Sequence, residues 1–516
     1  MMSFIQAHKS KVIGMISGWD RLRFRGTIRM LANVAGLWRF MCYKGWYLLK
    51  DFGQHAEALS RQTREASLAV AEAAGRPVVY LSDPGVCKED VAREIQARDG
   101  IQEGLICVLT AVEPCWSFNI RSNQAAGKLE LVRAYRKCQH LYHYYQHPVF
   151  GFMHVRLQTW LPFNQWVCLN GREWLGRQMD AAGIRYLRRE NCFAWIADVA
   201  GAQTLLDAQV RFHWAQGLGE LAPQVNPALA GIRGDCAMGY YWSVDESEWA
   251  SDIMFKDQGE LSRLYRRLVW HGIEALGSRD VLRFLGRRVE RGITPRLALD
   301  VVSDLKERPE GIRIKHRVGS NSVKMYNKQA TVLRTETTLN NVQELQAPRC
   351  KKGRVVWERM RKGVADIARR AEVSQGANAR YLEAMAAVES AVPLKTLTEA
   401  LARPVVREGR RFRGLNLLGE PDARLLAAVG DGKFVLQGFR NKDLQGMLFD
   451  TPADSLSERH RRSGQVTRKL ALLRAHGLIR KIGRTHRYHV TAKGRQVIAA
   501  LQAAREADVT KLAQAA

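Results

Sequence analysis

Four acidic residues have the type and placement to bind metal ions. Asp20 ends an expected strand, Glu113 follows another, Asp252 precedes a short apolar run, and Glu336 lies on a late strand. Carboxylate oxygens are the ligands that Mg²⁺ and Mn²⁺ prefer. Two such ions can hold the attacking and leaving oxygens of a phosphodiester. The four acids therefore predict a Mg²⁺ or Mn²⁺ site for cleavage of nucleic acid, of the kind that a transposase or resolvase needs.

A second constellation lies between Gly319 and Leu339, where the sequence reads GSNSVKMYNKQATVLRTETTL. It resembles the strand pair of rolling-circle replication initiators of the plasmid-transfer and filamentous-phage type. The resemblance implies that Tyr326 attacks a DNA phosphodiester and stores the bond as a phosphotyrosine. It also implies that Lys328 and Arg334 stabilise charge on the phosphate. A tyrosine enzyme of this type also needs metal-binding acids, so the tyrosine and two-metal mechanisms both stay open.

These residues need a scaffold of strands. Hydrophobic periodicity and turn residues predict strands and helices in alternation over the first 345 residues. The expected elements are two short strands in 11–27 around a turn at Gly18–Trp19–Asp20, a β-α-β unit in 76–110 with its helix at 88–97, two or three strands in 140–170, a mostly helical stretch in 171–310, and strands at 311–317, 322–327 and 332–339. Within them, His140–Tyr145 is expected to form a half-buried strand or a surface on which bases stack.

The C-terminal part of the chain differs in composition. Residues 401–516 hold 23 Lys or Arg and 10 Asp or Glu. Helices are expected at 422–428, 441–448 and 464–475, the last capped by Ser463 and ended by Gly477. A hairpin at 478–482 and 487–491 follows. Three helices and a hairpin, with a basic third helix, form the winged-helix plan, in which the third helix enters the major groove.

The run LLRAHGLIRKIGRTHRYHVTAKGR resembles the MarR-like winged-helix family, which implies DNA binding and no chemistry. Side chains in and beside the expected third helix and in the hairpin would contact the duplex. Gln465 and Arg468 would contact base edges. The DNA backbone would be contacted by Arg462, Ser463, Lys469, Arg484 and Arg487. The whole chain also resembles a family of bacterial proteins of similar length that is labelled by this MarR-like end, which implies no activity.

Composition narrows the class of protein. The formal net charge of +29 attracts polyanions, and nucleic acid is the usual one. No signal peptide or stretch long enough to span a membrane is found, and the nine cysteines never occur as CxxC. We therefore expect a cytoplasmic protein with free thiols. Walker A, GxGxxG, GxSxG and HExxH motifs are absent, so no nucleotide or nicotinamide cofactor is expected.

The sequence thus predicts an α+β protein in three parts: a mixed α/β core with helical insertions (1–345), a basic helical connector (346–400) and a winged helix-turn-helix domain (401–516). The leading hypothesis is a metal-dependent DNA strand-cleaving or strand-transfer enzyme of a mobile or replicating element. Double-stranded DNA would bind the winged helix, and single-stranded DNA or RNA could bind the core. A homodimer is compatible with this scheme. A DNA-binding regulator without catalysis and an RNA-binding component of a ribonucleoprotein are the alternatives.

Overall fold

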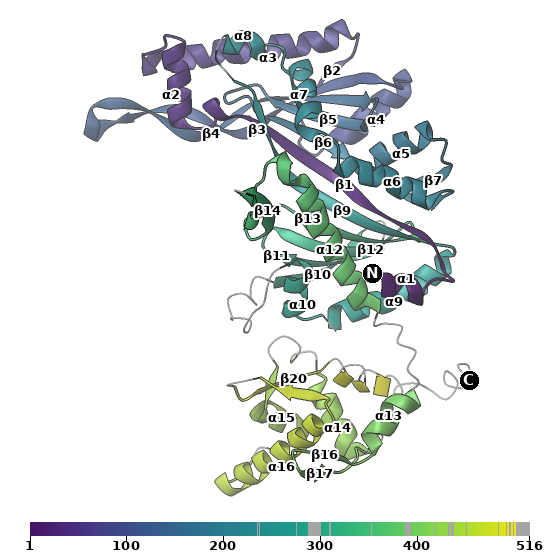
Figure 1. The fold of residues 1–516 in the computed structure, drawn as a ribbon. Coiled ribbons are helices and arrows are strands. Elements are labelled where there is room, and N and C mark those ends of the chain that lie inside the picture. Colours follow the sequence, from purple (N-terminus) through teal and green to yellow (C-terminus); the bar gives the residue numbers. More distant parts are fainter. Residues whose placement is uncertain are drawn as a thin grey trace. The chain divides into compact units, whose positions relative to one another are not determined.

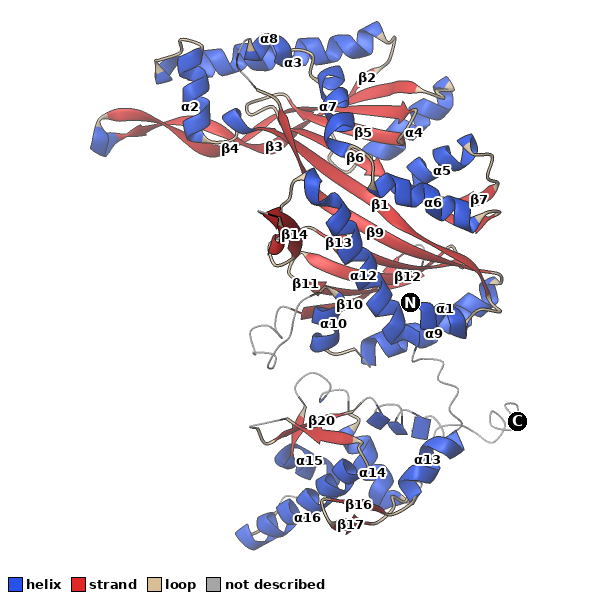
Figure 2. Cartoon of the chain, in the orientation of Figure 1, coloured by secondary structure: helices blue, strands red, loops and turns tan. Residues whose placement is uncertain are grey.

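The computed structural model has an α+β fold, as expected (Figures 1 and 2). Its internal contacts divide the chain into two compact units. The first comprises Met1–Tyr265 and Leu282–Glu383, and the second Arg266–Val281 and Ala384–Ala516. The structure describes residues 1–234, 236, 238–274, 276–286, 301–308, 311–351, 353–386, 394–417, 419–431, 434, 438–449, 451, 453–482, 485–491, 493–494, 497–498 and 500–501.

An eleven-stranded sheet organises the first unit. Its order is β10-β11-β12-β13-β9-β1-β6-β5-β4-β3-β2, and neighbours are antiparallel except for the parallel pair β2 and β3. The strands are β1 (Val12–Ile28), β2 (Val78–Tyr80), β3 (Gly104–Asn123), β4 (Lys128–His147), β5 (Gly151–Gln158), β6 (Gln165–Asn170), β9 (Tyr240–Phe255), β10 (Val301–Arg308), β11 (Gly311–Val318), β12 (Asn321–Lys328) and β13 (Val332–Leu339).

Strand β1 crosses the middle of this sheet without a break. The prediction of two strands turning at Gly18–Trp19–Asp20 is therefore wrong. Glycine serves close packing here, because a Cβ at Gly18 would lie 2.8 Å from the side chain of Leu206. The neighbour of β1 in the sheet is β9, which pairs with both β1 and β13. The expectation of a mostly helical 171–310 missed this strand, since β9 is buried on both faces over its second half and shows no alternation.

Helices cover the sheet and enclose its main core, which includes Trp19, Phe24, Trp174, Leu206 and Trp249. The helices in the described part of residues 1–385 are α1 (Met2–Ala7), α2 (Val34–Tyr43), α3 (Phe52–Ala73), α4 (Lys88–Asp99), α5 (Gly171–Ala181), α6 (Val199–Val210), α7 (Trp214–Val225), α8 (Leu229–Arg233), α9 (Gln258–Glu274), α10 (Ser278–Phe284) and α12 (Ile367–Met385). Strands β7 (Tyr186–Arg189) and β8 (Cys192–Ile196) form a separate hairpin. None of the helices in the described part of the chain has the length and apolar character that a membrane span requires.

The segment expected to be a helical connector, 346–400, begins instead with a hairpin of β14 (Gln346–Lys351) and β15 (Arg354–Arg359). Its helix α12 packs on the large sheet, where the buried Asn378 amide donates hydrogen bonds to the carbonyls of Trp249 and Thr335. The hairpin was missed because it buries almost none of its residues, and Val355 and Trp357 of β15 are 68% and 54% exposed, so no alternation of buried apolar positions marks its strands.

The β3 and β4 strands extend beyond the rest of the sheet. They pair with each other over nearly their full lengths, but β5 pairs with β4 only from His140 onward and β2 pairs with β3 only at 108–110. Residues 111–139 therefore form a long two-stranded arm, here called the β3–β4 ribbon, which projects from the sheet in Figure 1.

The second unit contains a small helical core with its own hydrophobic cluster, including Leu425, Leu444, Val466 and Leu470. Its elements are α13 (Leu394–Ala402), β16 (Val405–Arg407), β17 (Arg410–Phe412), α14 (Glu420–Val429), β18 (Phe439–Arg440), α15 (Asn441–Leu448), α16 (Leu456–Ala475), β19 (Ile479–Lys481) and β20 (Arg487–Val490). Strands β18, β20 and β19 form a three-stranded antiparallel sheet.

Helix α16 begins eight residues earlier than expected. Ser455, not Ser463, is its N-cap, and the Ser455 hydroxyl accepts a hydrogen bond from the Glu458 amide at 3.1 Å. Ser463 lies inside the helix, where its carbonyl accepts a bond from Asn441. The expected end is confirmed, with Gly477 at φ 73° directly after the C-cap.

Candidate functional site

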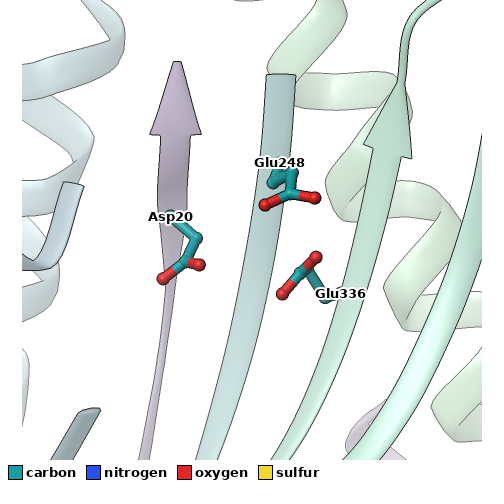
Figure 3. A group of neighbouring side chains, drawn as sticks. All are labelled: Asp20, Glu248 and Glu336. Atoms are coloured by element: carbon teal, nitrogen blue, oxygen red, sulfur yellow. The ribbon is translucent and has the colours of Figure 1, made fainter. Parts of the chain in front are cut away.

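Three carboxylates from neighbouring strands meet at the centre of the large sheet. Asp20 on β1, Glu248 on β9 and Glu336 on β13 each offer an oxygen, and these atoms lie within 4.8 Å of one another (Figure 3). All three residues are buried, with exposed fractions of 6%, 7% and 2%. Such a set of oxygens close together matches what a hard divalent cation needs.

The pairing of the strands explains this convergence. Glu336 lies opposite Ala250, and Glu248 lies opposite Thr338, so the two glutamates alternate with small or short side chains on one face. The register of β1 against β9 shifts between Trp19 and Arg21, which leaves Asp20 as the extra residue of a β-bulge. Bulges redirect a side chain and are frequent beside active sites.

Within the described part of the chain, four cations pair with the three carboxylates, and Arg21 and Arg172 are two of them, at 3.2 Å from Glu248 and 3.9 Å from Asp20. The Lys324 ammonium is 2.9 Å from Glu248 and 2.5 Å from Glu336. Burial alone would lower the pKa of Lys324, but the two glutamates outweigh it and raise that pKa, so the lysine stays charged. The buried Arg334 donates to Asp20 at 2.9 Å. The resemblance to rolling-circle initiators implied Lys328, not Lys324, as the lysine of this site. The structure places Lys328 at the far end of β12, opposite Val332.

Tyr326 lies next to the same cluster. Its hydroxyl donates to Glu336 at 2.7 Å, and only 8% of the residue is exposed. Burial, followed by the charge of Glu336, raises its pKa well above the ordinary value. The phenol therefore holds its proton, and in this arrangement it positions Glu336 better than it attacks a phosphate.

Asp252 lies one step farther along β9 and is completely buried. Arg334 contacts both of its oxygens, at 2.6 and 2.8 Å, and Arg172 lies 2.9 Å away. Burial alone would raise the pKa of Asp252, but the two guanidinium groups outweigh it and hold that pKa below its ordinary range. Its oxygens are thus committed to Arg172 and Arg334, and Asp252 anchors the site instead of adding a free metal ligand.

Arg334 is equally enclosed. Besides the two aspartates it donates to the Asn191 carbonyl at 2.7 Å, and its exposed fraction is zero. Burial alone would lower its pKa, but Asp20 and Asp252 outweigh this and raise it. The charge on Arg334 therefore orients the acids, and it has no surface from which to contact a phosphate directly.

Glu113 does not join the cluster. It lies on β3, four strands from β1, which corresponds to about 19 Å across the sheet. There it accepts a hydrogen bond from Tyr142 at 2.6 Å and pairs with Arg156 and Lys88. Burial alone would raise its pKa, but these partners outweigh it and lower that pKa. Glu113 therefore belongs to a separate ion-pair group.

The aromatic run after Gln139 packs inside the protein. His140 and His143 have no exposed surface, and Tyr142, Tyr144 and Tyr145 are 8% exposed or less. Burial lowers the pKa of both histidines to about 4, so they are neutral. The segment is a strand, but it is neither half-buried nor an open surface on which bases stack, because both of its faces are covered; Tyr142 alone of the run lines the cleft described next.

A cleft of about 570 Å³ opens beside the carboxylates and includes Asp20 and Glu248 in its wall. The rest of its wall includes arginines and aromatic rings, among them Arg21, Arg156 and Trp166, and two further acids, Glu89 and Glu246. Arg156 lies over the Trp166 ring at 4.7 Å. Cations stacked on rings offer partners for both phosphates and bases. A strand in this cleft would thus lie next to two of the three acids.

In the second unit the residues expected to contact DNA fall mostly on α16. Arg468 is exposed, and Gln465 and Lys469 are half-buried. Arg462 pairs with Glu458 at 2.6 Å and stacks on Phe449. Arg487 lies on β20 and donates to the Gly438 carbonyl, while Arg484 lies outside the described residues.

Comparison with known proteins adds no further guidance. No protein-family model matches the chain, and neither a curated protein nor a solved structure matches it. The geometry of the cluster, cleft and helices is therefore the basis for the functional argument.

Proposed function

We propose that this protein is a metal-dependent enzyme that cleaves or transfers DNA strands, with its C-terminal unit binding duplex DNA. The observation that carries the proposal is the meeting of Asp20, Glu248 and Glu336 within 4.8 Å. These residues come from three strands far apart in the sequence, and a cleft that contains arginines and aromatic rings includes Asp20 and Glu248 in its wall. Buried acids brought together this closely repel one another unless cations compensate them.

The three acids are the residues that would hold Mg²⁺ or Mn²⁺. When bound, such an ion polarises the phosphodiester and generates a nucleophile from water. Lys324 neutralises Glu248 and Glu336, which limits the repulsion between the acids while no metal ion is bound. Tyr326 holds Glu336 in place through its hydroxyl. Water is the attacking group in this proposal, since the Tyr326 phenol is buried and retains its proton.

In this proposal the second unit recognises the DNA site. Helices α14, α15 and α16 precede the β19–β20 hairpin, and this order supports a winged helix. The exposed Arg468 projects from α16 among several basic residues. Binding would then weaken steeply with salt, because each phosphate contact releases counterions.

Nicking of supercoiled DNA in Mg²⁺ or Mn²⁺ tests the enzyme proposal. Asp20→Asn, Glu248→Gln and Glu336→Gln should each abolish nicking, while Glu113→Gln should leave its rate unchanged. Tyr326→Phe should reduce the rate without abolishing it. Nicking that survives all three cluster substitutions would refute the proposal. A covalent protein–DNA adduct that disappears in Tyr326→Phe would replace the water mechanism with the tyrosine mechanism.

The second candidate is a DNA-binding regulator without catalysis. The observation that favours it is charge balance, since Lys324, Arg334 and Arg172 pair with the buried acids throughout the cluster. In that case the cluster is structural. Salt-sensitive duplex binding, together with no divalent-ion effect on thermal unfolding and no nicking of any substrate, would select it.

A further inference from the structure

The β3–β4 ribbon carries an aromatic and cationic face that the carboxylate site does not use. Trp116 on β3 lies opposite Tyr135 on β4, and their rings pack edge to face at 4.5 Å. Trp116 is 50% exposed and Tyr135 is 62% exposed. A cross-strand aromatic pair stabilises the ribbon. Because half or more of each ring is exposed, the pair also leaves apolar surface in water that a ligand can cover.

Cations lie on the same face of the ribbon. Lys137 shares the face of Tyr135 because the two are separated by two residues along β4. Arg133 lies two residues from Tyr135 in the other direction, and its guanidinium is 5.3 Å from the centre of the Trp116 ring. From Arg133 to Lys137 the strand spans about 14 Å. The positions opposite them on β3, at Phe118, Trp116 and Pro114, carry no charge.

The opposite face of the ribbon is occupied. Cys115 and Cys138 are buried in a cluster with Phe40 and Phe52 of α2 and α3. The Arg136 guanidinium lies 3.9 Å from the Trp160 ring on that side. Phe118, two positions from Trp116 on β3, belongs to the same buried cluster, so the ribbon is braced on both sides there. The exposed part of the aromatic face consists of Trp116, Tyr135 and the cations beside them.

We infer that this face binds unpaired bases of a nucleic-acid strand. Trp116 and Tyr135 would stack on bases, while Arg133 and Lys137 would neutralise neighbouring phosphates. Aromatic stacking accepts any base, because every base has a π-face. An acidic peptide would use the cations but would have no use for both rings. The inference rests on the proposed function, because an enzyme that cleaves or transfers DNA strands needs a surface that holds the unpaired strand. It makes a claim about binding and none about cleavage.

The test uses the full-length protein and fluorescein-labelled dT15, with binding followed by anisotropy at several salt concentrations. Trp116→Ala and Tyr135→Ala should each weaken binding by about 5- to 100-fold, as loss of one stacked base does. Trp116→Phe keeps a ring and should retain most of the affinity. Tyr80→Ala is the matched control, because Tyr80 is 60% exposed on β2 of the same sheet and lies off the ribbon.

Lys137→Gln separates stacking from charge. It should lower the slope of log affinity against log salt by about 0.7, the value for one phosphate contact with a single strand. Circular dichroism and thermal unfolding of each variant establish that the fold is retained. A parallel titration with rU15 shows whether the surface takes DNA, RNA or both, and all of these outcomes support the inference.

The inference would be overturned if Trp116→Ala and Tyr135→Ala bound dT15 as tightly as the wild type. It would also be overturned if the wild type did not bind dT15. Ribbon variants that weaken binding of a duplex but not of dT15 would also overturn it, since the ribbon would then enter a groove. The enzyme proposal is refuted by a different result, namely DNA nicking that is unchanged in Glu336→Gln. The anisotropy measurement with dT15 requires no metal ion. The two failures are therefore distinguishable.

Discussion

Arg334 is the residue whose removal should cost the large sheet most. Its guanidinium makes two contacts to Asp252, one to Asp20 and one to the Asn191 carbonyl. In Arg334→Met the side-chain volume is nearly kept, but two buried carboxylates lose their shared cation. Removing one partner of a buried ion pair costs about 3–5 kcal/mol. We expect a loss of this size in the free energy of unfolding at pH 7, measured by urea denaturation.

The pH dependence makes the prediction specific. Asp252 has a lowered pKa in the folded protein because its two arginines outweigh burial, so its contribution to stability is present above the unfolded-state value of about 3.9. That contribution is lost as the pH falls through the lower folded-state pKa. In the variant Asp252 is still buried but has lost the Arg334 guanidinium, so the pKa of Asp252 should be higher than in the wild type. The stability gap between Arg334→Met and wild type should therefore be widest at pH 7 and narrow as the pH approaches about 4.

A surface pair provides the control for this experiment. Arg64 is 31% exposed and pairs with Glu57 at 3.1 Å, so Arg64→Met should change stability by no more than about 1 kcal/mol. If Arg334→Met lies within that range, or if its deficit is independent of pH, the electrostatic account of the network is refuted.

Four further outcomes follow from the geometry. Mn²⁺ at about 100 times its dissociation constant should stabilise the wild type by about 2.7 kcal/mol in thermal unfolding and leave Glu248→Gln unaffected; equal stabilisation of both would contradict the site. Ser455→Ala should destabilise the C-terminal unit by about 1 kcal/mol, and Ser463→Ala should have little effect, because only Ser455 caps α16. Glu113→Gln should leave the metal response intact. Arg468→Ala should lower the salt slope of duplex binding by about 0.9, and an unchanged slope would exclude contact with a phosphate.

The late strands of the sheet could be predicted from sequence because their turns and apolar positions are regular. Strands β11, β12 and β13 lie where expected. With the turn at Gln329–Ala330, the register follows by counting back from Lys328 opposite Val332. That count places Lys324 opposite Glu336, so the lysine of the site was available to sequence reasoning and was missed only because the register was not followed.

Glu248 could not be found in this way. Its strand β9 is flanked by β1 and β13 and covered on both faces, so its sequence lacks the alternation that marks a half-exposed strand. Asp20 was identified as important, but for a turn that does not exist. The bulge at Asp20 depends on pairing with residues more than two hundred positions away, which no local pattern reports.

The order of strands at the carboxylate cluster also affects how the protein matures. Residues 20, 248 and 336 meet only when β9 lies between β1 and β13, so closing two very long loops must precede any assembly of the three oxygens. Such distant pairings form late and slowly. A ribosome-bound chain that has not yet released β13 therefore has no complete site, and any cutting activity would be acquired only after the sheet closes.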